Sequence, residues 1–214
     1  IGFDREGGAI AGARACDQVT RREFSIRARQ IVNATGPWVD DVCRLAGDSS
    51  GPHLAPTKGV HVIVPRARVG NEAALVLHAR RDRRVMFVIP WGAHALIGTT
   101  DTDHPGGPEV PPRVEADDVA YLLETVNYYC PAASLTPADV VGAYAGLRPL
   151  IAPLESEALR PSDVSREEEI HTSASGLISM AGGKLTTFRL AAEQIVDRVV
   201  DALRAAGDSR TFGP

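Results

Sequence analysis

The apolar and polar positions in the first part of the chain predict short strands followed by a helix. Residues 9–19 and 22–36 alternate between apolar and polar side chains, which is typical of strands joined in a meander. The second stretch ends in QIVNATG, a buried-strand pattern that stops at Gly36. In the following PWVDDVCRLAG, Pro37 suits the first position of a helix and Gly47 suits its C-terminal cap. We therefore expect a strand, a tight turn and a short helix over residues 30–47.

The middle of the chain predicts an antiparallel sheet. In KGVHVIVPR, the alternation puts Val60, Val62 and Val64 on one face of a strand and His61 with Ile63 on the other. The segments ALVLHA, RVMFVIPW and ALIGTTD read as three further strands, and the last two are close enough to form a hairpin. Residues 102–113 are dense in Pro and Gly and should form a loop.

Two longer helices are expected in the second half. Residues 114–129 carry acids in the first turn, and their apolar residues follow helical spacing: Val119, Leu122, Leu123 and Val126. Strand patterns follow in DVVGAYAGLRPL, EEIHTS and GLISMAGG. A final helix is predicted over about residues 186–205, with a buried face made of Phe188, Ala192, Ile195, Val199 and Leu203.

This order predicts a mixed α/β (α+β) fold in which the chain leaves one domain, builds a second and returns to the first. The boundaries we expect are 1–57 for the first part, 58–147 for the second domain and 148–214 for the return. The chain starts with IGFDREGGAIAG, inside a strand-rich pattern and without an initiator Met, so we expect it to be a piece of a larger protein.

Composition excludes some classes of protein. The chain has 23 basic and 27 acidic side chains and a formal net charge of −4, which disfavours a nucleic-acid binder. Its three cysteines form no zinc or CxxC pattern, so reduced thiols in a cytoplasmic protein and no metal site are expected. No apolar run approaches the roughly 20 residues of a membrane-spanning helix, so we expect a soluble protein that at most lies on a membrane surface.

The segment GGKLTT at residues 182–187 is the most specific candidate binding site. Adjacent glycines before a helix allow positive φ angles and close approach to the backbone, and a helix start attracts electron-rich groups. The segment is not a P-loop, because the GxxxxGK[ST] spacing is absent. The small residues of VNATGPW at 32–38 lie where a strand meets a helix, which suits either a cofactor or a tight structural turn.

Two polar side chains in apolar strands are candidates for binding and catalysis. Arg148 in GLRPL must find an anion, which could be a ligand or a structural ion-pair partner. His61 could be a catalytic base or a hydrogen-bonded core histidine. The threonines and Asp101 of GTTD could form local hydrogen bonds alone. The sequence GGAIAG at 7–12 fails the GxGxxG spacing of a dinucleotide-binding turn.

Taken together, several motifs resemble a known family. In order along the chain they are IVNATGPWVDD, PTKGVHVIVP, RVMFVIPW, LIGTTDTD, GLRPL, VSRE and GGKLTTFRLAAE. The chain resembles the FAD-dependent (quinone-linked) glycerol-3-phosphate dehydrogenases, which belong to the D-amino-acid-oxidase-like flavoproteins. The similarity runs from about residue 8 to 205. It implies a split FAD-binding domain (1–57 and 148–214) with an inserted antiparallel-sheet substrate domain (58–147), and without the Gly-rich βαβ unit and C-terminal helical domain of the family.

The resemblance also implies site residues. Ala34, Thr35 and Gly36 would lie beside FAD, and a second cofactor group would be Gly183, Lys184, Leu185 and Thr186. Arg148 and Lys184 would bind the substrate, and His61 is the candidate base. Arg166 has only a minor expected role, because the acids of SREEEIH depart from the family pattern. The cradle before the last helix, with Lys184, would favour the negative charge that a flavin acquires on reduction.

The implied activity is oxidation of sn-glycerol 3-phosphate to dihydroxyacetone phosphate by hydride transfer to FAD, with quinone as the electron acceptor. Peripheral contact with the inner face of the cell membrane and a homodimer are further expectations from the family. Two alternatives stay open from the sequence. The chain could be a catalytically incompetent fragment of such an enzyme, or it could come from an FAD-dependent amine or amino-acid oxidase of the same superfamily.

Overall fold

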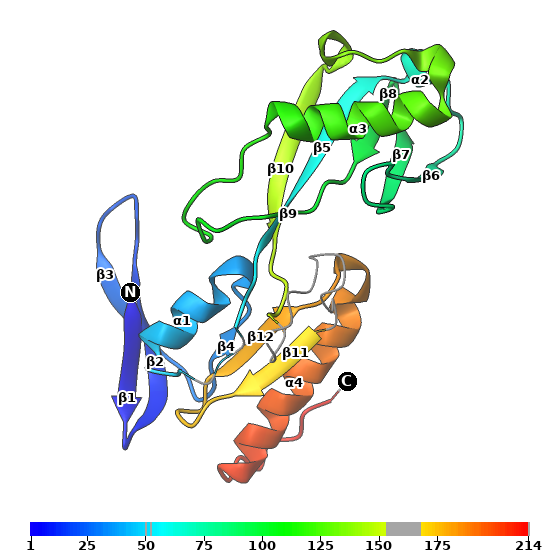
Figure 1. The fold of residues 1–214 in the computed structure, drawn as a ribbon. Helices are drawn as coiled ribbons and strands as arrows, with labels where there is room; N and C mark the ends of the chain where they lie inside the picture. Colours follow the sequence, from blue (N-terminus) through cyan, green and yellow to red (C-terminus); the bar gives the residue numbers. More distant parts are fainter. Residues whose placement is uncertain (50, 52, 153–167, 214) are drawn as a thin grey trace. The chain divides into compact units, whose positions relative to one another are not determined.

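The computed structural model describes residues 1–49, 51, 53–152 and 168–213, and these divide into two compact units (Figure 1). Unit 1 is built from the described residues of Ile1–Ala55, Pro149–Ser156 and Val164–Pro214. Unit 2 is built from those of Pro56–Arg148. Within the described ranges the chain has a mixed α/β fold with several sheets, so the predicted fold class is confirmed at that level.

Unit 2 contains an antiparallel sheet covered on one face by a helix. Among the described residues, its strands are β5 (Thr57–Pro65), β6 (Leu75–His78), β7 (Val85–Trp91), β8 (His94–Gly98), β9 (Thr102–Asp103) and β10 (Gly142–Arg148). They lie in the order β10-β5-β8-β7-β6, and β9 also pairs with β5. The helix is α3 (Ala116–Tyr129); short helical segments are α2 (Arg66–Val69), η2 (Pro131–Ala133) and η3 (Pro137–Asp139). The hairpin β7–β8 turns at Gly92 and Ala93, as predicted.

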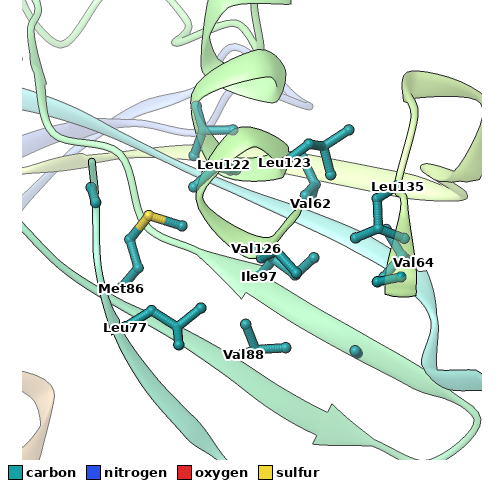
Figure 2. Close-up of a cluster of buried hydrophobic side chains, with 14 residues drawn as sticks. Val62, Val64, Leu77, Met86, Val88, Ile97, Leu122, Leu123, Val126 and Leu135 are labelled. Carbon is teal, nitrogen blue, oxygen red and sulfur yellow. The ribbon is translucent and has the colours of Figure 1, made fainter. Parts of the chain in front are cut away.

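The core of unit 2 lies between α3 and one face of this sheet (Figure 2). Val60, Val62 and Val64 of β5 are all 0% exposed and pack with Leu122 and Val126 of α3. The predicted two-residue period of β5 is therefore confirmed, as is the predicted apolar stripe of α3. The opposite face of the sheet carries His61 and Ile63 of β5 together with exposed apolar side chains of β7, namely Phe87, Ile89 and Trp91.

A buried ion pair connects the start of β5 to the start of α3. Nζ of Lys58, whose side chain is 8% exposed, donates to Oδ2 of Asp118 at 2.8 Å and to the carbonyl oxygen of Arg113. The same Asp118 oxygen accepts the backbone N–H of Glu115, which caps the helix. Burial lowers the pKa of Lys58, but the hydrogen bond and charge of Asp118, with Glu115, outweigh burial and raise the pKa above its usual value.

Unit 1 contains two three-stranded sheets within its described residues. One is an antiparallel meander of β1 (Gly2–Glu6), β2 (Ala9–Cys16) and β3 (Glu23–Arg27). The other has the order β11-β12-β4, from β11 (Glu168–Thr172), β12 (Ile178–Gly182) and β4 (Val32–Asn33). The helices of unit 1 are η1 (Gly36–Trp38), α1 (Val39–Leu45), η5 (Leu185–Thr187) and α4 (Phe188–Ala205). The strand, turn and short helix expected over residues 30–47 are present, and Gly47 follows α1 with φ +66°.

The predicted buried face of the last helix is wrong in part. Phe188 is 66% exposed and Ala192 is exposed, whereas the neighbouring Ala191 is buried at 2%. Ile195, Val199 and Leu203 are half-buried. Apolar residues occur on more than one side of α4, and Leu190 and Val196 are exposed as well. The helical period was therefore read correctly, but the sequence pattern alone did not determine which side of the helix packs against the sheet.

None of the helices in the described residues is both long and apolar enough to cross a lipid bilayer.

We expect Leu122→Ala to destabilise unit 2 by about 2–5 kcal/mol, because the side chain is 0% exposed and its removal leaves a cavity. Urea unfolding followed by circular dichroism measures this change. The matched control is Val76→Ala on β6, which is 61% exposed and should cost less than about 1 kcal/mol. Equal losses from the two variants would contradict the assignment of the core to the α3 face.

Candidate functional site

Two of the predicted site residues lie on the same face of the unit 2 sheet. His61 is in β5, and Arg148 ends the neighbouring β10, where it pairs with Thr57. Since Thr57, Gly59 and His61 alternate onto one face of β5, Arg148 extends over the same face. This is the face opposite α3, so the sheet separates the two side chains from the unit 2 core.

The guanidinium of Arg148 is fixed by several hydrogen bonds. Nη1 donates to Oδ1 of Asp101 at 3.1 Å, and Nη2 donates to Oγ1 of Thr99 at 2.8 Å and to the carbonyl oxygen of Thr100 at 3.1 Å. The Asp101 carboxylate is only 1% exposed, against 23% for the Arg148 side chain. The structural ion pair that the sequence left open for Arg148 is thus present, and the guanidinium has a defined orientation.

Gly59 provides the surface on which this guanidinium lies. A Cβ atom at Gly59 would lie 2.6 Å from Cζ of Arg148, which is too close for any real contact. A side chain at this position would therefore push Arg148 off the sheet. The hydrogen bonds to the GTTD turn and the missing side chain at Gly59 together define the position of Arg148.

His61 is half-buried and lies beside Arg148. Its ring stacks on Tyr144 of β10 with 5.0 Å between ring centroids and an interplanar angle of 13°. Within the described residues neither ring nitrogen makes a hydrogen bond, so His61 is not the hydrogen-bonded core histidine considered from the sequence. Burial lowers the pKa of His61, and the positive charge of Arg148 lowers it further. The imidazole is therefore neutral at pH 7 and able to accept a proton.

The predicted cofactor residues of unit 1 meet at one edge of a sheet. Strands β4 and β12 are parallel neighbours, with Val32 opposite Ile178 and Asn33 opposite Ser179. Carboxyl ends of parallel neighbours lie at the same edge. The turn of Ala34, Thr35 and Gly36 after β4 and the turn of Gly183 and Lys184 after β12 are consequently close together.

A buried asparagine holds the first of these turns. Nδ2 of Asn33 donates to the carbonyl oxygen of Val39 at 3.0 Å and to Oγ of Ser179 at 3.2 Å. Its Oδ1 accepts the hydroxyl of Thr35 at 2.7 Å. Asn33 is 2% exposed, so it connects β4, α1 and β12 inside the unit. The order of the Ala34–Gly36 turn depends on this residue, which the sequence analysis did not identify.

The second turn has the backbone that two adjacent glycines allow. Gly182 and Gly183 have φ angles of +72° and +81°, in the region that disfavours other residues. Lys184 and Thr186 are exposed, and Leu185 is 87% exposed, so this segment presents its backbone and the Lys184 ammonium to the outside of unit 1. Thr187 does not cap α4 with its side chain; its hydroxyl donates to the carbonyl oxygen of Lys184. Arg166 lies outside the described residues.

The structure thus brings the predicted residues together in two groups, one in each unit. His61 and Arg148 form the group in unit 2, and the Ala34–Gly36 and Gly183–Thr186 segments form the group in unit 1. The unit 2 group also contains residues to which sequence reasoning gave no such role. They are Asp101, Thr99, Gly59, Gly98 and Tyr144. Their contacts depend on strand register, for which the sequence offered no direct signal.

The depressed pKa of His61 predicts how stability depends on pH. A folded-state pKa below the usual 6.5 means that folding favours the neutral imidazole of His61. The contribution of His61 to the free energy of unfolding is therefore fully present above pH 6.5 and is lost as the pH falls through the folded-state pKa. We expect the free energy of unfolding to decrease as the pH is lowered from 6.5. His61→Gln should remove the part of this decrease that comes from the His61 imidazole. Urea titrations between pH 5 and 8 test it. His94→Gln, which removes an exposed imidazole from the same sheet, should retain the decrease.

Comparison with known proteins shows which proteins resemble this chain. Over 209 residues the chain is 40% identical to the aerobic glycerol-3-phosphate dehydrogenase of Bacillus subtilis (strain 168), covering 98% of this chain and 37% of that protein. The crystal structure of glycerol-3-phosphate dehydrogenase from Bacillus halodurans complexed with FAD matches 100% of this chain and 39% of that one, with a TM-score of 0.83 and 35% identity. Glycine oxidase from Bacillus cereus matches 87% of this chain and 43% of its own, with a TM-score of 0.56 and 18% identity, which shows a related fold alone.

The chain therefore spans well under half the length of these relatives. The resemblance inferred from the motifs is confirmed, because proteins named glycerol-3-phosphate dehydrogenase are similar in sequence to nearly the whole of this chain. The family model described as FAD dependent oxidoreductase (DAO) matches residues 1–196, and the chain belongs to this family.

Proposed function

We propose that this chain is part of an FAD-dependent glycerol-3-phosphate dehydrogenase. The reaction is oxidation of sn-glycerol 3-phosphate to dihydroxyacetone phosphate, with electrons passed on to a quinone. The observation that carries the proposal is the pair formed by Arg148 and His61 on the face of the sheet opposite α3. A fixed cation beside a neutral imidazole suits an anionic substrate that must lose a hydroxyl proton.

The residues of unit 1 fit an FAD molecule. Gly36 has φ +59° and no atom within 4 Å of where a Cβ would lie, and Gly182 and Gly183 also have left-handed φ angles. Backbone of this kind at the carboxyl ends of β4 and β12 allows a large planar ligand to approach closely. The cofactor would be held by residues of the two turns, namely Ala34, Thr35, Gly36, Gly183, Lys184, Leu185 and Thr186. FAD, when bound, supplies the acceptor of the substrate hydride.

Each candidate catalytic side chain has a distinct task in this proposal. Arg148 binds a phosphate or hydroxyl oxygen of the substrate with a guanidinium that Asp101 and Thr99 hold in place. His61 accepts the proton of the C2 hydroxyl, since burial and the charge of Arg148 keep its ring neutral. Lys184, at the start of the last helical segment, adds a point charge for the substrate or the cofactor.

The domain roles in this proposal come from the resemblance to the family. We assign residues 1–57 and 148–214 to the FAD-binding domain and residues 58–147 to the substrate domain. A quinone acceptor, contact with the inner face of the cell membrane and a homodimer are parts of the proposal that come from the resemblance rather than from any contact in the chain.

The fold likeness to glycine oxidase keeps an amino-acid oxidase as a second candidate. Arg148 could hold a carboxylate as well as a phosphate, so substrate preference separates the two candidates. A third case is that this chain alone is catalytically incompetent, because it spans 37% of the length of the Bacillus subtilis relative.

We expect the protein that carries this chain to purify with the visible absorption bands of oxidised flavin. Anaerobic addition of glycerol 3-phosphate should bleach those bands, and glycine or D-alanine should leave them unchanged. Bleaching by an amino acid instead would replace the first proposal with the second. The isolated 214-residue chain, tested in parallel, shows whether these residues retain FAD by themselves.

In the same full-length protein, Arg148→Lys should raise the KM for glycerol 3-phosphate by more than about twofold, because lysine cannot reproduce the two-pronged contact of a guanidinium. Steady-state kinetics with glycerol 3-phosphate measures the effect. Arg83→Lys, in the exposed β6–β7 loop, is the matched control and should leave KM unchanged. An unchanged KM in Arg148→Lys would remove Arg148 from substrate binding.

A further inference from the structure

The imidazole of His61 lies in a space that exists only because residue 98 is glycine. Strand register pairs His61 with Gly98 of β8, so a side chain at residue 98 would stand directly beside the ring. A Cβ atom there would lie 2.6 Å from Nε2 and 2.7 Å from Cγ of His61 and would overlap the ring. The ring therefore leans across β8, over Gly98.

Tyr144 closes the opposite side of the ring. It pairs with His61 from β10, and the two rings are nearly parallel with 5.0 Å between their centroids. The imidazole is consequently held between an aromatic ring on one neighbouring strand and an open backbone position on the other. With no hydrogen bond to orient it among the described residues, the ring takes its position from these packing contacts.

We propose that Gly98 and Tyr144 are positioning residues that hold the His61 imidazole between β8 and β10 and beside Arg148. This inference rests on the proposed role of His61 as base, and neither residue is assigned a direct contact with the substrate. Gly98 sets how far the ring can lean toward β8, and Tyr144 prevents it from turning toward β10. The ring is then presented in one orientation, and no group in the described part of the chain hydrogen-bonds to its nitrogens.

The electrostatic surroundings of the ring support this arrangement. From β10, Tyr144 stacks on it and the Arg148 guanidinium lies nearby, and that guanidinium donates to Asp101. From β8, Gly98 presents no side chain. Any displacement of the ring toward solvent would reduce both its burial and its interaction with Arg148. Each of these changes raises the pKa of the imidazole toward its usual value.

The first test follows the His61 ring by NMR titration of the 214-residue chain without cofactor, with the signal assigned from a His61→Gln sample. His61 should titrate below 6.5, and Gly98→Ala should move its pKa upward toward 6.5. Gly146→Ala is the matched control: it lies on the adjacent β10, and a Cβ there would meet no atom within 4 Å. The control should leave the titration unchanged.

The second test uses Tyr144 and needs no change at the glycine. Tyr144→Phe keeps the stacked ring and should preserve the titration, whereas Tyr144→Leu removes it and should raise the pKa of His61. This pair remains informative if Gly98→Ala does not fold. A pKa of His61 that stays the same in both Gly98→Ala and Tyr144→Leu would overturn the proposal.

The third test measures turnover of glycerol 3-phosphate by the FAD-loaded protein. Gly98→Ala should lower kcat at least about tenfold with a smaller change in KM, because misplacing a general base removes part of its contribution. In a His61→Gln background the same substitution should have no further effect, since it acts through His61. A further tenfold loss in that background would show that Gly98 acts elsewhere. If the protein with wild-type sequence does not oxidise glycerol 3-phosphate, the proposed function fails while the titration result stands.

Discussion

The strict alternation of side chains along β5 is the constraint on which the unit 2 site depends. Val60, Val62 and Val64 are buried under α3, and this burial determines which face the intervening His61 occupies. A slip of one residue would expose three valines and bury the imidazole, so the register is strongly specified by the core. The pairing of β10 and β8 with β5 then brings Arg148, Tyr144 and Gly98 to that same face. Packing on one face of the sheet thus determines which polar side chains lie together on the other face.

Ionic contacts near the first residues of β5 reinforce this register. Lys58 is tied to Asp118 on the α3 side, and Arg148, opposite Thr57, is tied to Asp101 on the other side. Removing one partner of a buried pair costs about 3–5 kcal/mol, because the remaining charge is left without compensation. The Lys58 pair therefore favours one alignment of β5 with the start of α3, and the Arg148 pair ties the end of β10 to the turn that follows β8. The Arg148–Asp101 pair also orients a candidate substrate-binding group, so structure and proposed function share the same contact.

Local patterns predicted much of this structure, and contacts distant in sequence account for what they missed. The faces of β5, the α3 stripe, the β7–β8 hairpin and the glycine turn before η5 could all be read from periodicity and turn residues. His61 and Arg148 were singled out because each interrupts an apolar strand. Tyr144, Gly98 and Asn33 were not, since their importance arises from strand pairing across many residues. Part of the packed side of α4 was also missed, because apolar side chains occur on more than one side of that helix and Ala191 rather than Phe188 is buried.

The discontinuity of unit 1 has a consequence for biosynthesis. Strand β4 pairs in parallel with β12, with Val32 opposite Ile178. This pairing can form only after Ile178 has left the ribosome, and all of Pro56–Arg148 is translated before then. The described residues of unit 2 form one stretch, Pro56–Arg148, which allows this part of the chain to fold first during translation. Throughout this interval the nascent chain exposes the edge of β4, an opportunity for chaperone capture or for mispairing with a neighbouring polypeptide.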